Sequence, residues 1–485
     1  MSFNSYIFIF LFLPLSLAGY FGLNKIKQYS LAKIFLILMS FWFYGYFNPS
    51  YLIIMLASIG LNYCLSYLML KSNKDIIRKL SLTAGLTFNI GVLFIFKYYD
   101  FFVTNLNAVA GTDFALKHLV LPLGISFFTF QQLSYVIDSY QKTVPVYNIF
   151  DYSLFVTFFP QLVAGPIVLH SEVVPQFADK TKKKMNADNF AKGMMAFSFG
   201  LAKKVLIADT LGRIVNFGFA DISSLDATNA FIVMLSYTLQ LYFDFSGYCD
   251  MATGIGCMFN IDLPMNFNSP YRATTILEFW DRWHLTLTRF FTRYVYIPLG
   301  GSRRGKVRTY INVFIVFLVS GIWHGANWTF IVWGICHGLF SVFTRMFKKV
   351  FDKIPRIINW IITFTFVNLT WVIFRAESLV QAIDFWHILF NGTWGPISLG
   401  VSEHMDLPEI YLIHKLLLTR TDQFMYWFAI AFLIFAFVAS IFMKNTNEKI
   451  KTFKPNVITA IVTAILLAYS IVSLSGVSTF LYFNF

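Results

Sequence analysis

Residues Val319–Leu339 read VSGIWHGANWTFIVWGICHGL and lie inside an apolar run that has no Asp, Glu, Lys or Arg between Ile311 and Val342. A run of this length is typical of a segment that crosses a membrane. Residues Val319–Leu339 nevertheless contain two histidines, one asparagine, three tryptophans and four glycines. Polar groups at membrane depth are costly, and they usually face a protein interior or a wet cavity. The stretch therefore predicts a membrane segment with a functional side.

His324 is the central candidate in this stretch. It stands between Trp323 and Gly325, and Asn327 follows about one helical turn later. A buried histidine is often a neutral residue that is hydrogen-bonded to a neighbouring backbone carbonyl, and this structural interpretation is open here. An imidazole also has an unperturbed pKa of about 6.5, so it can accept a proton from an alcohol at neutral pH. The flanking glycine and asparagine favour this second, catalytic interpretation.

The composition indicates an all-α, polytopic membrane protein. The chain has 485 residues, of which 57% are hydrophobic and 13% are charged, whereas soluble domains carry about 25% charged residues. The four cysteines form no CxxC pair, so the sequence indicates neither a disulfide framework nor a zinc site. The net charge of +14 comes from Lys and Arg in short loops between apolar runs. This positive-inside pattern argues against nucleic acid as a partner.

The apolar runs predict about 11 membrane segments, together with re-entrant and interfacial helices. The runs lie at residues 3–23, 32–47, 51–70, 80–102, 119–136, 152–169, 190–211, 230–245, 311–342, 357–374, 424–443 and 457–474. Two prolines and a glycine interrupt residues 152–169 and predict a broken or re-entrant segment. Residues 244–271 are too rich in Gly, Asn, Asp and Pro for a lipid-facing helix, and residues 391–422 are expected to form a polar loop. We expect both chain ends outside the cytosol.

A second polar cluster, WDRWH at residues 280–284, precedes a basic turn at residues 300–308. Arg282, Arg289 and Arg293 have a spacing that places them on one face of a helix. The segment predicts an amphipathic helix at the membrane interface, where tryptophans and snorkelling arginines act as an anchor. The competing interpretation is that His284 approaches the central histidine while the arginines face a polyanionic donor.

Other polar residues also have two interpretations. The basic turn at residues 303–308 is typical of loops that set membrane orientation and contact anionic lipids, and the alternative is that it holds the phosphates of a donor. Asp244, Asp250 and Asp262 are candidates for an ion or proton site. Their spacing fits no metal-binding loop and favours helix capping and packing. His337 is expected to make a structural polar contact.

Six stretches of the chain together carry a family pattern. They read LPLGISFFTFQQLSYVID, FFPQLVAGPI, YFDFSGYCDMATGIGCMFNIDLPMNFNSPY, FWDRWHLTLTRFFTRYVYIPLGGSRRG, GIWHGANWTFIVWGICHGL and WVIFRAES, and they cover most of residues 121–378. In this combination the chain resembles the membrane-bound O-acyltransferase family. It is most similar to the bacterial branch that contains the membrane subunit for alginate O-acetylation and its peptidoglycan and cellulose counterparts.

The resemblance implies one membrane-embedded domain, residues 1–485, whose helices surround a central tunnel. The motif-bearing core is expected at residues 119–378, with peripheral helices at 1–115 and 380–485. The resemblance implies that His324 is the catalytic histidine and His284 the second histidine of the reaction chamber. The residues expected to line the chamber or bind the donor are Asn327, Trp323, Trp280, Trp283, Arg282, Arg289 and Arg293. Asp281 departs from the family, whose members commonly carry a basic residue there.

The resemblance also implies an O-acyltransferase that moves an acetyl or other short acyl group from cytosolic acetyl-CoA across the bacterial cytoplasmic membrane. The product would be an O-acetylated cell-envelope or extracellular polysaccharide, and the identity of that polymer stays open. The expected acceptor is an extracytoplasmic SGNH-type acetyltransferase or the polymer itself. No bound cofactor and no metal are expected.

Acyl transfer from a thioester needs a base for the acceptor hydroxyl and hydrogen-bond donors for the developing oxyanion. His324 can be the base, and Asn327, His284 or backbone N–H groups can be the donors. Two alternatives from other classes stay open. A proton-coupled transporter of polymer or lipid precursors would usually show paired internal repeats, and none is visible in the sequence. A structural scaffold for an envelope complex would not need the intact WHG cluster.

Overall fold

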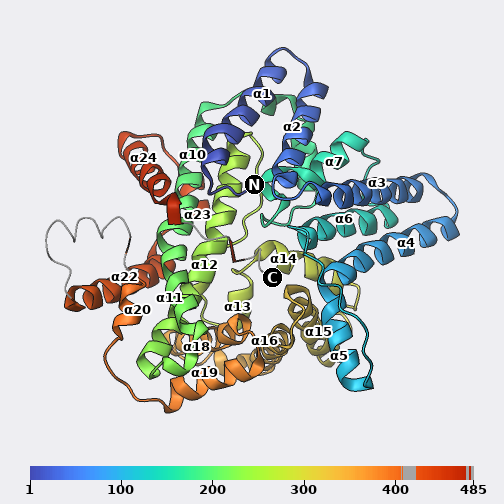
Figure 1. The fold of residues 1–485 in the computed structure, drawn as a ribbon. Coiled ribbons are helices and arrows are strands. Elements are labelled where there is room, and N and C mark those ends of the chain that lie inside the picture. The colour runs from blue at the N-terminus through green and yellow to red at the C-terminus, as the bar shows by residue number, and fades with distance from the viewer. Residues whose placement is uncertain (406, 408–421, 477–479, 482–485) are drawn as a thin grey trace. The chain divides into compact units, whose positions relative to one another are not determined.

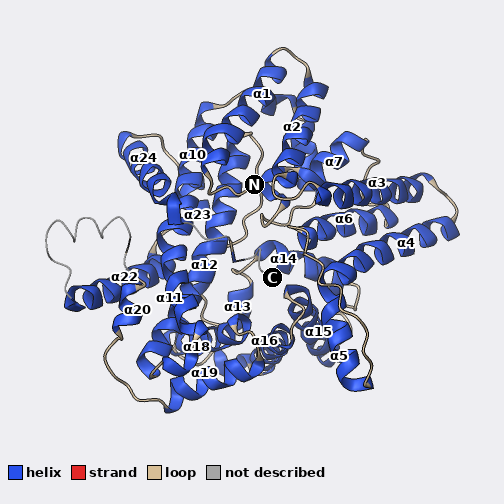
Figure 2. Ribbon diagram, in the orientation of Figure 1, coloured by secondary structure: helices blue, strands red, loops and turns tan. Residues whose placement is uncertain are grey.

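The computed structural model describes the whole chain except residues 406, 408–421, 477–479 and 482–485 (Figure 1). Within the described residues all regular structure is helical and no strand occurs (Figure 2). The chain forms two compact units: unit 1 comprises Met1–Phe197 with Met251–Met265, and unit 2 comprises Ser198–Asp250 with Asn266–Phe485. The single domain expected from the family resemblance stays a prediction.

Seven helical stretches among the described residues are long and apolar enough to cross a membrane. They are Phe8–Lys25, Ser50–Lys71, Asp75–Ala110, Lys306–His324, Trp328–Met346, Arg356–Arg375 and Phe424–Phe442. Two shorter apolar helices, Tyr29–Gly45 and Val457–Val472, accompany them. The predicted all-α, multi-pass membrane class is therefore confirmed. The predicted number of about 11 segments is compatible with this set and stays a prediction.

Unit 1 is built from helices whose buried faces carry polar side chains. Its elements are η1 Phe8–Phe12, α1 Leu13–Lys25, α2 Tyr29–Gly45, α3 Ser50–Lys71, α4 Asp75–Leu93, η2 Phe94–Tyr98, α5 Tyr99–Ala110, α6 Ile125–Tyr140, α7 Ile149–Thr157, α8 Phe159–Leu162, α9 His170–Ala178, η3 Lys180–Lys183 and most of α10 Ala187–Ala202. Gln132 of α6 is buried and bonds to Ser58 and Asn62 of α3 at 2.8 and 3.0 Å. The predicted break within residues 152–169 is confirmed, since α8 ends at Leu162.

Unit 2 contains both candidate histidines. Its elements are η4 Lys203–Ala208, α11 Asp209–Ala220, η5 Ile222–Ser224, most of α12 Ala227–Met258, η6 Pro270–Arg272, α13 Ile276–Trp280, α14 Leu285–Phe291, η7 Thr292–Tyr296, α15 Lys306–His324, α16 Trp328–Met346, α17 Lys348–Phe351, α18 Arg356–Arg375, α19 Leu379–Asn391, α20 Leu399–Glu403, α22 Asp422–Phe442, α23 Thr446–Lys451, α24 Val457–Val472 and η8 Ser473–Gly476. The polar loop expected at 391–422 includes α20, and its residues 408–421 lie outside the described residues.

The apolar run around His324 is a helical hairpin and not one membrane segment, which corrects the expectation from the sequence. α15 ends at His324, a short turn follows, and α16 begins at Trp328 beside it (Figure 1). The two backbones approach closely at glycines. A Cβ at Gly321 would lie 2.5 Å from the Phe330 carbonyl oxygen, and one at Gly334 would lie 2.6 Å from the Phe317 carbonyl oxygen. Small residues of this kind are what close helix packing in membranes requires.

α12 continues through Asp244 to Met258, and its residues 244–258 are buried. This agrees with the expectation that the segment is not a lipid-facing helix. The Lys204 ammonium lies 2.7 Å from Asp244, and the Lys203 ammonium lies 2.6 Å from Asp250. These ion pairs agree with the packing interpretation of the two aspartates. Asp262 belongs to unit 1, where its carboxylate lies 2.6 Å from the Lys182 ammonium.

The amphipathic helix expected after residue 274 is interrupted at Asp281–His284, between α13 and α14. The cause is a local pairing with the preceding segment. The Asn268 N–H donates to the Arg282 carbonyl at 2.9 Å, and the Leu285 N–H donates to the Asn266 carbonyl at 2.9 Å. Because the helix is broken between them, Arg282 does not share one continuous helical face with Arg289 and Arg293.

Candidate functional site

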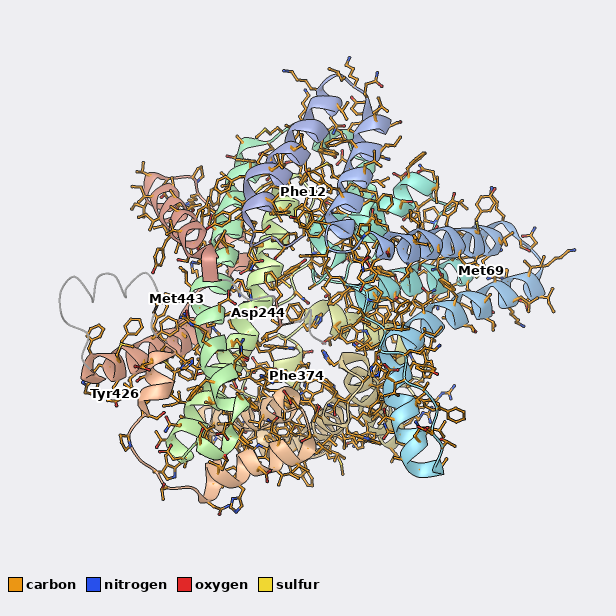
Figure 3. All side chains as sticks on the ribbon, viewed as in Figure 1. Phe12, Met69, Asp244, Phe374, Tyr426 and Met443 are labelled. Carbon is orange, nitrogen blue, oxygen red and sulfur yellow. The ribbon has the colours of Figure 1, made fainter. Side chains whose placement is uncertain are left out.

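His324 is enclosed by aromatic rings at the end of α15. Its imidazole centroid lies 4.9 Å from the Trp323 ring and 5.2 Å from each of the rings of Trp333 and Phe374. Figure 3 labels Phe374, near the end of α18. All four side chains are buried. Three helices of unit 2 thus place the central histidine in an aromatic chamber that leaves little room for bulk water.

Asn327 closes the turn of the hairpin. Its side-chain oxygen accepts a hydrogen bond from the Thr329 N–H at 3.2 Å, as the cap of α16, and its amide donates to the Glu377 carbonyl at 2.9 Å. Such a cap satisfies a backbone donor that the first helical turn leaves unpaired. Asn327 therefore fixes the chain beside His324, while its predicted contact with the donor stays a prediction.

His284 is held in one tautomer by Asn266. The Thr286 N–H and hydroxyl both bond to the Asn266 side-chain oxygen, at 3.3 and 2.9 Å, and the Asn266 amide donates to Cys249 Sγ at 3.2 Å. His284 Nδ1 lies 3.0 Å from the same Asn266 oxygen. Because that oxygen can only accept, Nδ1 must carry the proton. The neutral ring then presents Nε2 as a hydrogen-bond acceptor.

The backbone and burial of His284 are both unusual. Its φ of 46° and ψ of 52° lie in the left-handed region, which costs energy for a residue with a Cβ. Its side chain is buried, and this burial lowers the pKa of His284 to about 3, so the ring is neutral at physiological pH. Conformations of this kind often occur at functional sites, where the surrounding structure maintains them.

Trp323 connects the two histidines. Its ring centroid lies 4.9 Å from that of His324 and 6.5 Å from that of His284. The sequence led us to expect that His284 approaches His324. In the structure the imidazoles of both residues pack against the Trp323 indole. They come from α15 and from the turn before α14, which are distant in sequence.

A cavity of about 370 Å³ runs along α15 toward this chamber. The face of α15 that lines it consists of Thr309, Val313, Val316, Phe317 and Ser320. These positions span about 16 Å of helix, and the next positions on the same face are 323 and 324. At the other end, a second cavity of about 450 Å³ shares four lining residues with the first, Leu277, Ser302, Thr309 and Arg345. The two cavities form one groove, which reaches to within about one helical turn of His324.

A comparison with protein families decides the class of this site. The model of the membrane-bound O-acyltransferase family matches residues 41–380, which include both histidines and the groove. The chain belongs to the membrane-bound O-acyltransferase family. The prediction made from the six sequence stretches is thereby confirmed.

Curated relatives of this O-acyltransferase act on bacterial polymers. A peptidoglycan O-acetyltransferase of Helicobacter pylori is 40% identical over 100% of this chain and 97% of its own length. A protein of Pseudomonas aeruginosa named "Probable alginate O-acetylase" is 39% identical over 81% of this chain and 76% of its own length. A teichoic acid D-alanyltransferase of Bacillus subtilis is 26% identical over 54% of this chain.

The groove of the O-acyltransferase is not lined by the arginines that the sequence suggested. Arg282 pairs with Glu278 at 2.9 Å and donates to the Asn268 carbonyl at 3.1 Å. Arg289 and Arg293 line neither cavity described above. The basic groups that do line the groove are Arg345, Lys306 and Lys348. Donor binding by the three predicted arginines stays a prediction, as does phosphate binding by the basic turn that contains Lys306. Arg345 and Lys348 are additional candidates.

The tryptophans of the WDRWH cluster separate into two roles. Trp280 lines the groove, and its indole N–H donates to His337 Nδ1 at 3.3 Å. His337 Nε2 lies 3.0 Å from the Thr370 hydroxyl, so both ring nitrogens are engaged within the protein. These bonds agree with the structural role expected for His337. Trp283 is buried in the core, where its ring lies 5.1 Å from that of Trp371.

Proposed function

We propose that this O-acyltransferase transfers an acetyl group from cytosolic acetyl-CoA across the bacterial cytoplasmic membrane for O-acetylation of peptidoglycan. Membership of the family supports acyl transfer, and the relatives support a cell-envelope or extracellular polysaccharide as the final acceptor. Peptidoglycan is favoured because the H. pylori peptidoglycan O-acetyltransferase matches the whole chain, whereas the alginate-related protein matches 81% of it.

In this proposal His324 is the base that removes the proton from the acceptor hydroxyl as it attacks the acyl carbonyl. The aromatic rings around it exclude water, which would otherwise hydrolyse the thioester. His284 has a different role, because its Nδ1 proton is engaged by Asn266 and its Nε2 can accept a hydrogen bond. It orients a hydroxyl or amide group next to the chamber.

The groove along α15 is the proposed path of the donor. Its outer end carries Lys306, Arg345 and Lys348, which suit a phosphate-bearing head, and its inner end is largely apolar. The hairpin brings the start of α15 and the end of α16 to the same side of unit 2, so both basic loops can be cytosolic. A thioester arm lying in the groove would then point toward His324.

The acceptor on the opposite side is an extracytoplasmic SGNH-type acetyltransferase or the polymer itself. Neither bound metal nor a resident cofactor has a part in this mechanism; acetyl-CoA is consumed as a substrate. The observation that best supports this proposal is the position of His324. It is buried among aromatic rings, one helical turn beyond a groove whose outer end is basic.

The test is ester-linked acetate on peptidoglycan. The chain is expressed with its partner proteins in a bacterium that lacks its own peptidoglycan O-acetylation, and acetate is released by mild base from purified peptidoglycan. We expect wild-type protein to restore acetylation and His324→Ala to abolish it at equal membrane abundance. His387→Ala is the control, because His387 is exposed on α19. Acetate at the wild-type level in His324→Ala would refute the assigned role.

A further inference from the structure

The groove carries its charges in a definite order along its length. Lys306 and Lys348 line only the outer cavity, Arg345 lines both cavities, and Asp281 lines only the inner one. Beyond the carboxylate the lining is apolar except for hydroxyl groups, and it ends at Ser320, one turn before the chamber. An incoming ligand therefore meets three cations first and a single carboxylate afterwards.

Asp281 is held in this position by its neighbours. It follows Trp280, whose indole is anchored to His337, and its backbone N–H donates to the Leu277 carbonyl at 3.1 Å. The helix break after α13 exposes its side chain to the cavity. Burial raises the pKa of the Asp281 carboxyl, and the Arg345 guanidinium opposes this rise, so the two charges interact across the groove.

A carboxylate and a guanidinium select for different parts of a ligand. Arg345 offers paired N–H donors that match phosphate geometry. Asp281 repels phosphate, but it accepts hydrogen bonds from neutral amide N–H groups. A polyanion is thus favoured at the outer end and disfavoured in the inner cavity, where an uncharged chain with amide groups is favoured.

We propose that Arg345 and Asp281 form a donor-selectivity site that accepts a phosphorylated pantetheine thioester. Arg345, with Lys306 and Lys348, binds the phosphates, and Asp281 accepts a hydrogen bond from an amide of the pantetheine arm. The carboxylate also stops the phosphates from sliding inward, which fixes how far the acyl group reaches toward His324. The inference rests on the proposed function and adds the residues that decide which thioesters are used.

The experiment compares donors with and without phosphate. Inside-out membrane vesicles from cells that express the protein with its partners are supplied with acetyl-CoA, acetyl-phosphopantetheine or acetyl-pantetheine, and initial rates of acetyl transfer give KM and kcat. We expect Arg345→Gln to raise KM about tenfold for both phosphorylated donors and to leave KM for acetyl-pantetheine unchanged. Acetyl-phosphopantetheine also distinguishes a free acetyl-CoA donor from a pantetheine arm carried by a protein. If its KM equals that of acetyl-CoA, the site does not need the nucleotide and a carrier-bound donor fits. If its KM is higher, the site also binds the nucleotide.

Asp281→Ala is expected to raise KM severalfold for all three donors, because it removes the contact with the arm that they share. Lys349→Gln is the matched control, since Lys349 is an exposed lysine beside Lys348 that lines neither cavity. It should change KM for no donor. Equal abundance of each variant in the vesicles, and an unchanged kcat at saturating donor, show that the site is intact.

Four outcomes would overturn the proposal. Arg345→Gln could raise KM equally for phosphorylated and phosphate-free donors, which would make the arginine structural. Asp281→Ala could lower KM for acetyl-CoA, which would show that the carboxylate only repels the anionic donor and makes no favourable contact with the arm. Wild-type vesicles could transfer acetyl from no thioester, which would refute the proposed function and this inference together. Normal wild-type transfer without discrimination by the variants would refute the selectivity site alone.

Discussion

The two imidazoles near Trp323 are held in different ways. His284 has its Nδ1 proton committed to Asn266 and a pKa lowered by burial to about 3, so it is a weak base. His324 stands at the end of a helix among aromatic rings, one turn beyond the groove. These differences support the proposal that His324 acts as the general base and His284 as an orienting hydrogen-bond acceptor.

The tautomer of His284 gives a prediction about Asn266. Asn266→Leu removes the acceptor for the Nδ1 proton, frees the ring to change tautomer, and should lower the rate of acetyl transfer at least about tenfold. Thr286→Val is the control, because it removes a hydroxyl from the same cluster and leaves the bond between His284 and Asn266 in place. Transfer rates in vesicles and thermal stability in detergent are measured for both variants. Equal losses in the two variants would show that the cluster acts only in packing.

The sequence suggests candidate residues where the signal is local. His324 and His284 became candidates from WHG and WDRWH, since each motif is contiguous, and their roles stay predictions. Lys306 belongs to the basic turn that was already considered for phosphate binding, whereas Arg345 and Lys348 were missed because they lie in α16 and α17. Only the fold of α15 against α16 brings them to one end of a groove, and spacing along the chain gives no sign of it.

At the scale of elements, the hairpin was missed because an apolar run without charges does not show where a helix turns. One local signal was present: an asparagine directly before a helix is a common N-cap, and Asn327 has that role here. The partners of the α12 aspartates could not be predicted either, because Lys203 and Lys204 come to lie beside Asp250 and Asp244 only in the fold.

Close contact within the hairpin gives the second prediction. Gly334→Ala would place a Cβ 2.6 Å from the Phe317 carbonyl oxygen and 3.1 Å from the Gly321 Cα, and backbone atoms cannot move aside cheaply. We expect α15 and α16 to separate, with a lower melting temperature in detergent and a strong loss of transfer. Gly60→Ala in α3 is the matched control, because nothing lies within 4 Å of the added Cβ. That variant should keep or slightly raise the stability. An unchanged Gly334→Ala protein would contradict the packing argument.

The buried ion network gives the third prediction. The Lys204 ammonium lies 2.8 Å from Asp209 and 2.7 Å from Asp244, and it joins η4 to α11 and α12. Lys204→Met leaves buried carboxylates without their cation, which costs about 3–5 kcal/mol. We expect a clear fall in melting temperature, and the double variant Lys204→Met with Asp244→Asn should recover part of it. A double variant less stable than Lys204→Met would show that the Asp244 carboxylate stabilises the fold even without the lysine, which would contradict the argument from an unpaired buried charge.

At the scale of the whole molecule, the distribution of basic loops can be compared with contacts inside each unit. In unit 1, Lys33 pairs with Asp151, and Arg78 donates to the Tyr140 carbonyl. Tyr140 is the last residue of α6 and Asp151 lies in the first turn of α7, so both partners flank the short connection between these helices. The basic ends near residues 33 and 78 therefore lie on the same side of this unit. In unit 2, the hairpin of α15 and α16 places the loops at 303–308 and 348–356 on one side of the unit. Two helices return the chain to the side from which it entered, whereas a single span would have placed these two basic loops on opposite sides of the membrane.

The fold class and multi-pass character followed from composition and run length, whereas the division into two units did not. Two of the three breaks fall inside helices, after Phe197 in α10 and after Asp250 in α12, and the third follows Met265 in the segment after α12. The residues around Phe197 and Asp250 are mostly buried and form no polar linker. Domain boundaries are visible in sequence mainly when they coincide with exposed, polar segments.

The last prediction concerns the side from which the donor enters. Single cysteines are placed at exposed positions of a chain whose four native cysteines are replaced, with Cys249→Ser chosen to keep an acceptor for Asn266. Lys184→Cys and Arg303→Cys report the expected cytosolic side of the two units, and Asp113→Cys and Glu377→Cys report the opposite side. Lys184 is used because the adjacent Lys183 is buried against the Phe177 carbonyl and would react poorly.

A membrane-impermeant thiol reagent is applied to intact cells and to permeabilised cells. We expect Asp113→Cys and Glu377→Cys to react in intact cells, and Lys184→Cys and Arg303→Cys to react only after permeabilisation. Arg303 lies in the basic turn that precedes α15, and the outer end of the groove begins at the neighbouring Ser302 and Gly305. Reaction of Arg303→Cys in intact cells would place that end of the groove outside the cytosol. Acetyl-CoA could not then enter beside Lys306, and the path assigned to the donor would have to be reversed.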